Sequence, residues 1–287
     1  MWDKNQLRDL VREKIGDATF VVVSNREPYM HVMKEGRVHV VRPASGLVTA
    51  VDPMLRACRG TWIAHGSGNA DRKVVDDGGR VMVPPENPLY TLKRVWLSKA
   101  EEDGYYYGFA NSALWPLCHN VYARPTFDQR SWEIYRQVNR KFADAVLAEI
   151  EGKKAFVWVQ DYHLALVPAM IKEKRPDAVV VQFWHIPWPN PDIFRICPWK
   201  DEILWGMLGN DVMGFHIRYH CDNFLSCVDQ SLEVRVDRER SSVFHHGGLE
   251  CKVRPYPISI DAASIEEEIL RGIEVDEEAS DILASIP

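Results

Sequence analysis

Apolar residues recur along the chain with two different periods that alternate. Short runs rich in Val, Ile, Phe and Trp predict buried strands at residues 19–24, 61–65, 90–97, 155–160, 178–184, 212–215 and 249–260. Apolar positions three and four residues apart predict helices between them, at residues 47–58, 126–150, 164–174, 200–208 and 219–228. Strands that alternate with helices of these lengths predict an α/β fold with a doubly wound, mostly parallel sheet of the Rossmann-like type.

Three segments lie outside this alternation. Residues 1–17 combine apolar positions at helical spacing with charges of both signs, which predicts an amphipathic surface helix rather than a signal peptide. Residues 30–41 alternate around Lys34-Glu35-Gly36, which predicts an inserted β-hairpin. Residues 261–287 are rich in acids, so we expect one Rossmann-like lobe at residues 1–260, followed by an acidic helical tail or hinge.

The composition is that of an ordinary globular protein and removes several other classes. Of the 287 residues, 46% are hydrophobic and 26% are charged, which argues against a disordered chain or a coiled coil. The formal net charge of −6 argues against nucleic acid as the main partner. No apolar run approaches the roughly 20 residues that cross a membrane. The six cysteines form no CxxC pair, which indicates reduced thiols and a cytoplasmic protein.

Polar residues that follow predicted strands are the first candidates for chemistry, because doubly wound sheets bind ligands beyond the carboxyl ends of their strands. Arg26 follows the first strand, where it could bind a phosphate or form only a surface ion pair. Ser45 and Gly46 precede a helix, whose free backbone N–H groups could bind an anion, although a plain N-cap explains them equally well.

Two further candidates follow the strands at residues 155–160 and 178–184. Asp161 could accept hydrogen bonds from sugar hydroxyls or move a proton, or it could only cap the next helix. His185 lies in the segment 184–191, where three prolines and an asparagine predict a rigid extended loop. A histidine held on such a loop favours a functional role over a structural one.

Other motifs are weaker. The segment His65-Gly66-Ser67-Gly68 resembles half of a dinucleotide fingerprint, but Asp71 stands where the third glycine belongs, which disfavours an NAD oxidoreductase. No P-loop sequence occurs. His216 and His220 have helical spacing but lack the glutamate of a zincin, so we expect no metal and no cofactor.

Taken together, these motifs resemble the trehalose-6-phosphate synthase family, which are retaining glycosyltransferases of the two-lobed GT-B fold. The match runs in order across most of the chain, and several of its motifs are long and unusual in composition. They are Ser24-Asn25-Arg26, Gly46-Leu47, residues 106–116 (YYGFANSALWP), residues 158–163 (WVQDYH), residues 185–189 (HIPWP), residues 211–215 (DVMGF) and Tyr256-Pro257-Ile258, which leads to Asp261.

The resemblance implies four residues that bind the acceptor sugar. Arg26 would bind the phosphate of glucose 6-phosphate, Tyr106 and Asp161 would position the sugar, and Trp115 would shape its pocket.

On the donor side, the resemblance implies that Ser45 and Gly46 offer backbone N–H groups to the diphosphate of a nucleotide sugar. His185 would contact the donor glucose near the reacting centre. Ser45 stands where a glycine is common in the family, and its Cβ could narrow the approach of the diphosphate.

The implied reaction transfers glucose from UDP-glucose, or a similar nucleotide sugar, to glucose 6-phosphate with retention, which gives trehalose 6-phosphate. The leaving diphosphate would take the acceptor proton, while Asp161 and His185 would act as catalytic-site residues that orient the reactants without a metal. In the family a second lobe carries most of the nucleotide site. We therefore expect this chain to need a C-terminal lobe, in cis or in trans, and to be inactive alone.

Two other readings stay open at this point. The same scaffold could make a glucosylglycerol phosphate or a pseudo-glycosidic product, because a changed acceptor could keep the phosphate-binding arginine. The chain could also be a non-catalytic domain that senses a sugar phosphate. Asp161 and His185 favour an enzyme, because a sensor needs neither.

Overall fold

A computed structural model describes residues 4–245, 248–258 and 269. The chain divides into two compact units, Met1–Pro257 and Ile258–Pro287. Ile258 and Ile269 are the described residues of the second unit, so the predicted acidic tail at 261–287 lies, apart from Ile269, outside the described residues. None of the described helices is long and apolar enough to span a membrane.

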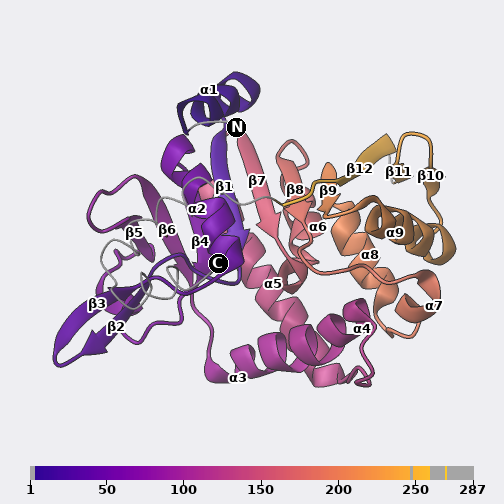
Figure 1. The fold of residues 1–287 in the computed structure, drawn as a ribbon, viewed down its shortest axis with the longest axis horizontal. Coiled ribbons are helices and arrows are strands. Elements are labelled where there is room, and N and C mark those ends of the chain that lie inside the picture. Colours follow the sequence, from indigo (N-terminus) through magenta and orange to yellow (C-terminus); the bar gives the residue numbers. More distant parts are fainter. Residues whose placement is uncertain (1–3, 246–247, 259–268, 270–287) are drawn as a thin grey trace, which may run out of the picture. The chain divides into compact units, whose positions relative to one another are not determined.

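One sheet of ten strands organises the first unit (Figure 1). Its parallel strands are β1 (Thr19–Ser24), β4 (Thr61–His65), β6 (Tyr90–Val95), β7 (Ala155–Gln160), β8 (Val179–Phe183), β9 (Val212–Phe215) and β12 (Leu249–Pro255). Antiparallel strands close both edges: β5 (Arg80–Val83) at one, and β10 (Arg235–Asp237) with β11 (Ser242–His245) at the other. The order across the sheet is β10-β11-β12-β9-β8-β7-β1-β4-β6-β5.

This strand order places a topological switch point between β1 and β7. The chain proceeds from β1 to β4 and β6 on one side, and then continues with β7, β8, β9 and β12 on the other. Doubly wound sheets bind their ligands at such a point, outside the carboxyl ends of the strands. Asn25 and Arg26 follow β1 and Asp161 follows β7, so these residues flank the switch point.

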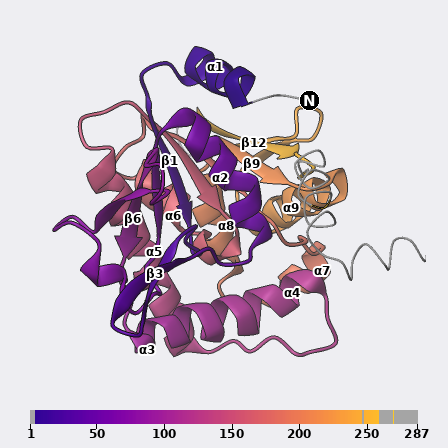
Figure 2. The ribbon, with the colours of Figure 1, turned by 60° about the vertical axis from the view of Figure 1, so that its left-hand side comes forward.

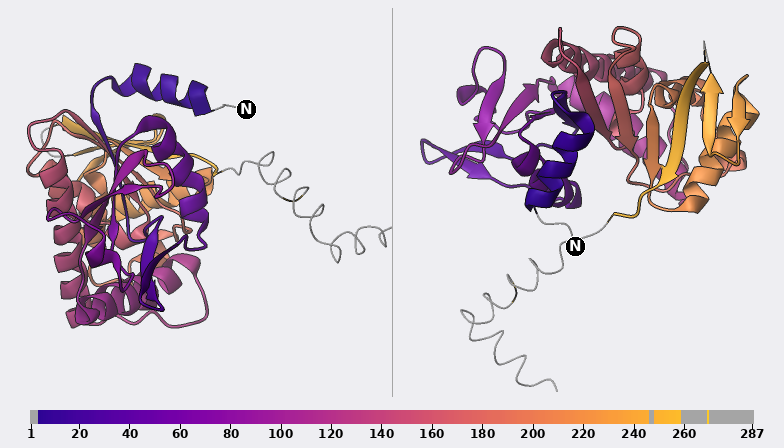
Figure 3. Two further views of the ribbon diagram at one scale, coloured as in Figure 1. Left: turned by 90° about the vertical axis from the view of Figure 1, so that its left-hand side faces the viewer. Right: turned by 90° about the horizontal axis from the view of Figure 1, so that it is seen from above.

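Alternate residues of the central strands face two separate hydrophobic cores. Val21 and Val23 of β1 belong to the larger core, whereas Phe20 and Val22 belong to the smaller one, as the two-residue period of a strand requires. The view from above in Figure 3 shows helices on both faces of the sheet. Residues of α5 (Gln129–Glu149), α6 (Val167–Lys172), α8 (Lys200–Leu208) and α9 (Arg218–Ser231) fill the larger core, and residues of α2 (Gly46–Cys58) fill the smaller. Burial on both faces explains the continuous apolar runs of the parallel strands.

The carboxyl-terminal edge of the sheet carries elements that approach the switch point. A hairpin of β2 (Met30–Lys34) and β3 (Arg37–Val41) follows β1. After β6, a helical segment of α3 (Lys99–Glu102), the π-helix η2 (Asp103–Leu114) and α4 (Trp115–His119) lies at the end toward which β1 and β7 point (Figures 1 and 2). A π-helix is rare and frequently marks a functional site. The remaining elements are α1 (Lys4–Ile15), η1 (Asp71–Lys73), η3 (Tyr162–Leu164) and α7 (Pro191–Phe194).

The structure confirms the predicted fold class, a doubly wound, mostly parallel sheet with a hairpin insertion. The sequence does not predict β5, β10 and β11, because these short edge strands are only partly buried and lack the continuous apolar run of a central strand such as β9. The helix predicted at 164–174 is divided into η3 and α6, and Pro168 lies in the first turn of α6. The predicted loop at 184–191 ends at Asn190, whose side chain caps α7.

Candidate active site

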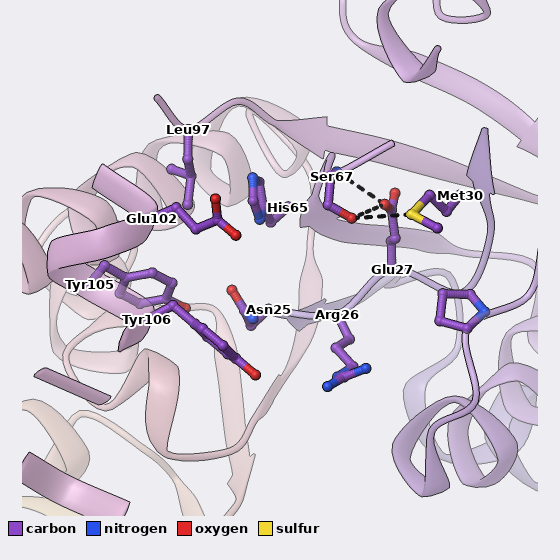
Figure 4. Close-up of a pocket in the computed structure, with 11 residues that line it drawn as sticks. Asn25, Arg26, Glu27, Met30, His65, Ser67, Leu97, Glu102, Tyr105 and Tyr106 are labelled. Carbon is purple, nitrogen blue, oxygen red and sulfur yellow. Dashed lines mark hydrogen bonds between the residues drawn. The ribbon is translucent and has the colours of Figure 1, made fainter. Parts of the chain in front are cut away.

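A pocket of about 260 Å³ lies at the carboxyl ends of β1, β4 and β6 (Figure 4). Residues that follow these strands form most of its wall, and η2 contributes two tyrosines. It is lined by Asn25, Arg26, Glu27, Met30, Pro43, His65, Ser67, Leu97, Glu102, Tyr105 and Tyr106. Pockets for drug-sized ligands measure roughly 300–1,000 Å³, so this one suits a smaller metabolite.

Arg26 brings an unpaired positive charge to this pocket. Its side chain is exposed and forms no ion pair or hydrogen bond within the described part of the chain. Its backbone, in contrast, is fixed: the Ser24 hydroxyl donates to the Arg26 carbonyl oxygen at 2.6 Å, and Trp62 Nε1 donates to the Ser24 hydroxyl at 2.8 Å. The alternative of a surface ion pair is therefore not supported. A free guanidinium on a fixed backbone can bind a phosphate with two hydrogen bonds.

A buried ionic cluster anchors the loop that carries Arg26. Glu27 pairs with Arg94 of β6, and its Oε1 accepts hydrogen bonds from the backbone N–H of Ser67 at 3.0 Å and from the Ser67 hydroxyl at 2.8 Å (Figure 4). Arg94 also lies 3.0 Å from Asp71 and donates to the carbonyl oxygen of Tyr29 at 2.9 Å. Glu27 and Asp71 are only 2% and 0% exposed. The cluster thus joins the loop after β1 to the segment after β4 and to β6.

The ring of Tyr106 packs against a neutral histidine, His163. The two rings stack, with centroids 5.3 Å apart and an interplanar angle of 7°. Burial, with smaller contributions from Arg26 and His185, lowers the pKa of His163 to about 3. His163 therefore stays uncharged at neutral pH and holds Tyr106 by stacking, while Arg26 supplies the positive charge.

The backbone of Asp161 is strained. Its φ of 69° and ψ of 174° lie in a region that is essentially restricted to glycine. Two hydrogen bonds hold this conformation: the Asp161 N–H donates to the carbonyl oxygen of Phe183 at 2.7 Å, and Gln182 Nε2 donates to the Asp161 carbonyl oxygen at 3.1 Å. Such strain costs about 1–3 kcal/mol and concentrates at functional sites, so it favours a role for Asp161 beyond the fold.

The side chain of Asp161 joins the ends of β7 and β8. Its carboxylate accepts hydrogen bonds from the backbone N–H groups of Tyr162 at 2.9 Å and His185 at 3.2 Å. It therefore does cap η3, as the simpler expectation held, but it also binds the next strand's loop. Burial raises the pKa of Asp161 to about 7, although both hydrogen bonds act in the opposite direction. A carboxyl group with this pKa can accept hydrogen bonds from hydroxyls or exchange a proton near neutral pH.

His185 is held at the end of β8 by three contacts. Besides its N–H bond to Asp161, its carbonyl oxygen lies 3.0 Å from Nε2 of His216, and its ring Nε2 lies 2.9 Å from Oε1 of Gln160. Burial, with a smaller contribution from His216, lowers the pKa of His185 to about 4. The imidazole is therefore neutral at pH 7.

The structure brings four of the predicted site residues into one connected group. Arg26 and Tyr106 line the pocket, and His163 connects Tyr106 to Asp161, since its Nδ1 lies 3.8 Å from the carboxylate. Asp161 in turn bonds to His185. Residues that are far apart in the sequence thus form one site at the switch point.

Three predicted residues stand apart from this group. Trp115 is 40% exposed and stacks on His119 at 4.1 Å, and no ring contact joins it to the other site residues within the described chain. Ser45 occupies the N-cap of α2, but its side chain forms no capping hydrogen bond. A Cβ at Gly46 would meet nothing within 4 Å, so the fold itself does not require a glycine there. Pro43, in the loop before α2, lines the pocket.

Sequence reasoning assigns no role to several residues that build the site. His163 lies in the WVQDYH motif, three residues after the end of β7, and that motif is a signal that could identify it. Glu27 and Arg94 are 67 positions apart, since 94 minus 27 is 67, and no local pattern connects them. Glu102, the last residue of α3, lines the pocket beside residues that follow β1 and β4.

Comparison with known proteins gives one consistent family. The model of glycosyltransferase family 20 matches residues 18–284. The chain is 40% identical over 257 residues to a trehalose-6-phosphate synthase of Mycolicibacterium gilvum, covering 87% of this chain and 50% of the relative. It is 39% identical over 259 residues to that of Mycolicibacterium vanbaalenii, covering 88% and 52%. The chain spans about half the length of the curated relatives it matches.

Solved structures of similar fold agree. A structure from E. coli bound with UDP-2-fluoro glucose superposes with a TM-score of 0.71 at 27% identity, covering 86% of this chain and 50% of the other. An α,α-trehalose-phosphate synthase (UDP-forming) from Burkholderia vietnamiensis superposes with a TM-score of 0.76 at 25% identity, covering 93% and 54%.

Proposed function

The chain belongs to glycosyltransferase family 20, and on this basis we propose that it forms the acceptor-binding lobe of an α,α-trehalose-phosphate synthase. The complete enzyme transfers glucose from UDP-glucose to glucose 6-phosphate and releases trehalose 6-phosphate and UDP. The similarity to a structure that holds UDP-2-fluoro glucose supports this donor, and the names of the mycobacterial relatives support the product.

The observation that carries the acceptor assignment is the unpaired guanidinium of Arg26 beside a pocket of about 260 Å³. A phosphate offers oxygens that match the guanidinium fork. Beyond Arg26, the pocket wall presents Tyr106, Asn25 and Glu102, which suit sugar hydroxyls. A hexose phosphate combines these two chemistries in one small molecule.

In the transfer step, the bond between the donor C1 and the diphosphate oxygen breaks, and a bond from C1 to the acceptor O1 forms on the same face. The departing diphosphate takes the acceptor proton. The residues of this lobe act by position: Arg26 and Tyr106 hold the acceptor, Asp161 orients its hydroxyls, and His185 contacts the donor sugar. The backbone N–H groups of Ser45 and Gly46 face the diphosphate, and Trp115 shapes the acceptor pocket.

A second lobe completes this site. Because the chain spans about half the length of its relatives, we infer that the groups that bind the nucleotide belong to a C-terminal lobe, supplied in cis or in trans. The lobe described here binds glucose 6-phosphate alone but turns over negligibly.

Titration calorimetry of the chain with glucose 6-phosphate tests the proposal. We expect binding by the wild type and an affinity about 10–100-fold lower for Arg26→Ala, because a hydrogen bond to a charged group contributes about 1.5–3 kcal/mol. Arg130→Ala is the matched control, since Arg130 is an exposed arginine of α5 outside the pocket, and it should leave the affinity unchanged.

Parallel titrations with glucose and with glycerol 3-phosphate separate the two halves of the ligand. Both should bind more weakly than glucose 6-phosphate. Equal affinity of the wild type and Arg26→Ala would contradict the acceptor assignment, and tighter binding of glycerol 3-phosphate would favour a different acceptor. Full synthase activity of the isolated chain would contradict the need for a second lobe.

A further inference from the structure

The ends of β7 and β8 bring an amide and an imidazole together beside Asp161. Gln160 is the last residue of β7 and pairs in register with Phe183, the last residue of β8, so His185 follows only two positions later. Gln160 is 1% exposed, and its Oε1 lies 2.9 Å from Nε2 of His185. Its Nε2 is also buried and has no partner, so the contact with His185 is the one hydrogen bond that this amide forms within the described chain.

This contact determines where the imidazole carries its proton. An amide oxygen only accepts hydrogen bonds, so His185 Nε2 must be the donor. In a neutral imidazole the other nitrogen then has a free lone pair. No described residue forms a hydrogen bond with His185 Nδ1, whereas the backbone of His185 is bound on both sides, by Asp161 and by His216.

We propose that Gln160 is a positioning residue that holds His185 as the Nε2–H tautomer, so that Nδ1 is presented to the ligand as a hydrogen-bond acceptor. A nitrogen that accepts hydrogen bonds can bind a hydroxyl group, because a hydroxyl can donate one. It disfavours an ionised phosphate oxygen, which has no hydrogen to donate. Gln160 thereby makes the β8 end of the site specific for sugar hydroxyls, while Arg26 binds the phosphate at the β1 end. That the hydroxyl belongs to a sugar rests on the proposed function, but the tautomer itself does not.

The surroundings of His185 favour the neutral ring on which this selectivity depends. Its edge packs against Phe183 at 4.7 Å and against His216 at 6.0 Å between ring centroids. The charged group that faces it, Asp161, is engaged by the His185 backbone rather than by its ring. An ordinary buried hydrogen bond biases the tautomer equilibrium by about tenfold, which places about nine-tenths of the rings in one form.

Long-range ¹H–¹⁵N correlation spectra of the full 287-residue chain, labelled at histidine, measure the tautomer directly. His185→Asn assigns the signals by removing them. At pH 7 we expect a protonated, pyrrole-type nitrogen at Nε2 and a pyridine-type nitrogen at Nδ1. The opposite pattern would mean that the Gln160 amide is reversed, and it would overturn the proposal without any variant at Gln160.

Two substitutions separate positioning from packing. Gln160→Met keeps the length of the side chain but removes the acceptor, so the preference of about tenfold should collapse to a mixture of the two tautomers. Gln160→Glu keeps an acceptor oxygen and should retain the Nε2–H form. If Gln160→Met has a backbone spectrum typical of the folded chain and keeps the same ratio of His185 tautomers as the wild type, Gln160 does not have the proposed role.

These outcomes are independent of the proposed function. If glucose 6-phosphate fails to bind while His185 has the expected tautomer, the acceptor assignment fails and the role of Gln160 stands. If glucose 6-phosphate binds but Nε2 is the pyridine-type nitrogen, the role of Gln160 fails and the acceptor assignment stands.

Discussion

The two sides of the switch point hold their polar groups in opposite ways. On the β1 side, Arg26 is exposed and unpaired within the described chain, and the fixed charges lie one residue further on, where Glu27 pairs with the buried Arg94. On the β7 side, Asp161 and His185 are themselves half-buried and are held by backbone hydrogen bonds. The β1 side therefore anchors the neighbour of its exposed arginine, and the β7 side anchors its polar groups directly.

The difference follows from the charge that each side has to present. A guanidinium remains ionised in any environment, so Arg26 can keep its hydration until a phosphate replaces the water. A carboxylate or an imidazole changes its protonation when it is buried, and this change sets whether it donates or accepts a hydrogen bond. Burial on the β7 side thus selects hydrogen-bonding character, whereas exposure on the β1 side preserves charge.

The largest expected effect comes from breaking the anchor of the β1 side. Arg94→Met leaves Glu27 and Asp71 buried without their cation. Removal of one partner from a buried ion pair costs about 3–5 kcal/mol, so we expect the free energy of unfolding to fall by that amount in urea denaturation. The affinity for glucose 6-phosphate should fall as well, because the loop that carries Arg26 loses its attachment.

The matched control is Arg42→Met. The side chain of Arg42 is 55% exposed and lies 3.0 Å from Asp52, which also binds Arg56. Asp52 is buried, but it keeps its ion pair with Arg56 and its hydrogen bond from the Tyr90 hydroxyl. The loss of the largely exposed Arg42 side chain should therefore cost at most about 1 kcal/mol. Equal losses for the two arginines would mean that the buried cluster gives the β1 side no special rigidity.

The fold is predictable from sequence because strands buried on both faces of the sheet have continuous runs of apolar residues. The bounds of β7, β9 and α8 agree with their predicted ranges residue by residue. What local pattern cannot supply is the strand order, which depends on pairings such as that of Val21 with Val157. The switch point, and therefore the grouping of Arg26 with Asp161, becomes visible only when that order is known.

The candidate site was predictable where a polar residue lies within two positions of the end of a strand, as Arg26, Asp161 and His185 do. It was not predictable where the residue acts through a distant partner. The role of Arg94 depends on its ion pair with Glu27. The role of His163 depends on its ring stacking with Tyr106 of η2. The strained backbone of Asp161 has no signature in the sequence either, since an aspartate after a strand normally adopts ordinary angles.

The β7 side should show its burial in the pH dependence of stability. The pKa of Asp161 is about 7 in the folded chain, against about 3.9 for an exposed aspartate. The folded state therefore holds this proton more tightly between these values. The contribution to stability is complete below about pH 4 and is lost as the pH rises through 7, by at most about 4 kcal/mol.

Asp161→Asn provides the reference for this effect, because its amide does not titrate. Urea denaturation of both proteins between about pH 4 and pH 7 measures their free energies of unfolding. As the pH rises, the wild type should lose stability relative to Asp161→Asn. If the stabilities of the two proteins change in parallel with pH, the Asp161 carboxylate is better solvated than its burial indicates. The β7 side would then resemble the β1 side.

The smallest effect tests whether the anchoring of Asp161 really holds a strained backbone. Asp161→Gly and Asp161→Ala both remove the carboxylate and its two hydrogen bonds, so these losses cancel in the comparison. Alanine is ordinarily the more stable of such a pair by about 0.4–1 kcal/mol, because glycine gives the unfolded chain more freedom. At φ 69° and ψ 174° alanine retains a strain of about 1–3 kcal/mol that glycine escapes. The glycine variant should therefore be the more stable by about 1 kcal/mol.

The same pair of substitutions at Glu133, an exposed residue within α5, should show the ordinary order, with alanine ahead by about 1 kcal/mol. If alanine is also the more stable at position 161, the backbone there is relaxed, and its hydrogen bonds with Gln182 and Phe183 do not hold a strained conformation. Opposite signs at the two positions mean that the backbone at position 161 strains any residue with a Cβ, the native aspartate included. The β7 side then carries its carboxylate at a cost in backbone strain, whereas Arg26 on the β1 side is not among the residues with a positive φ.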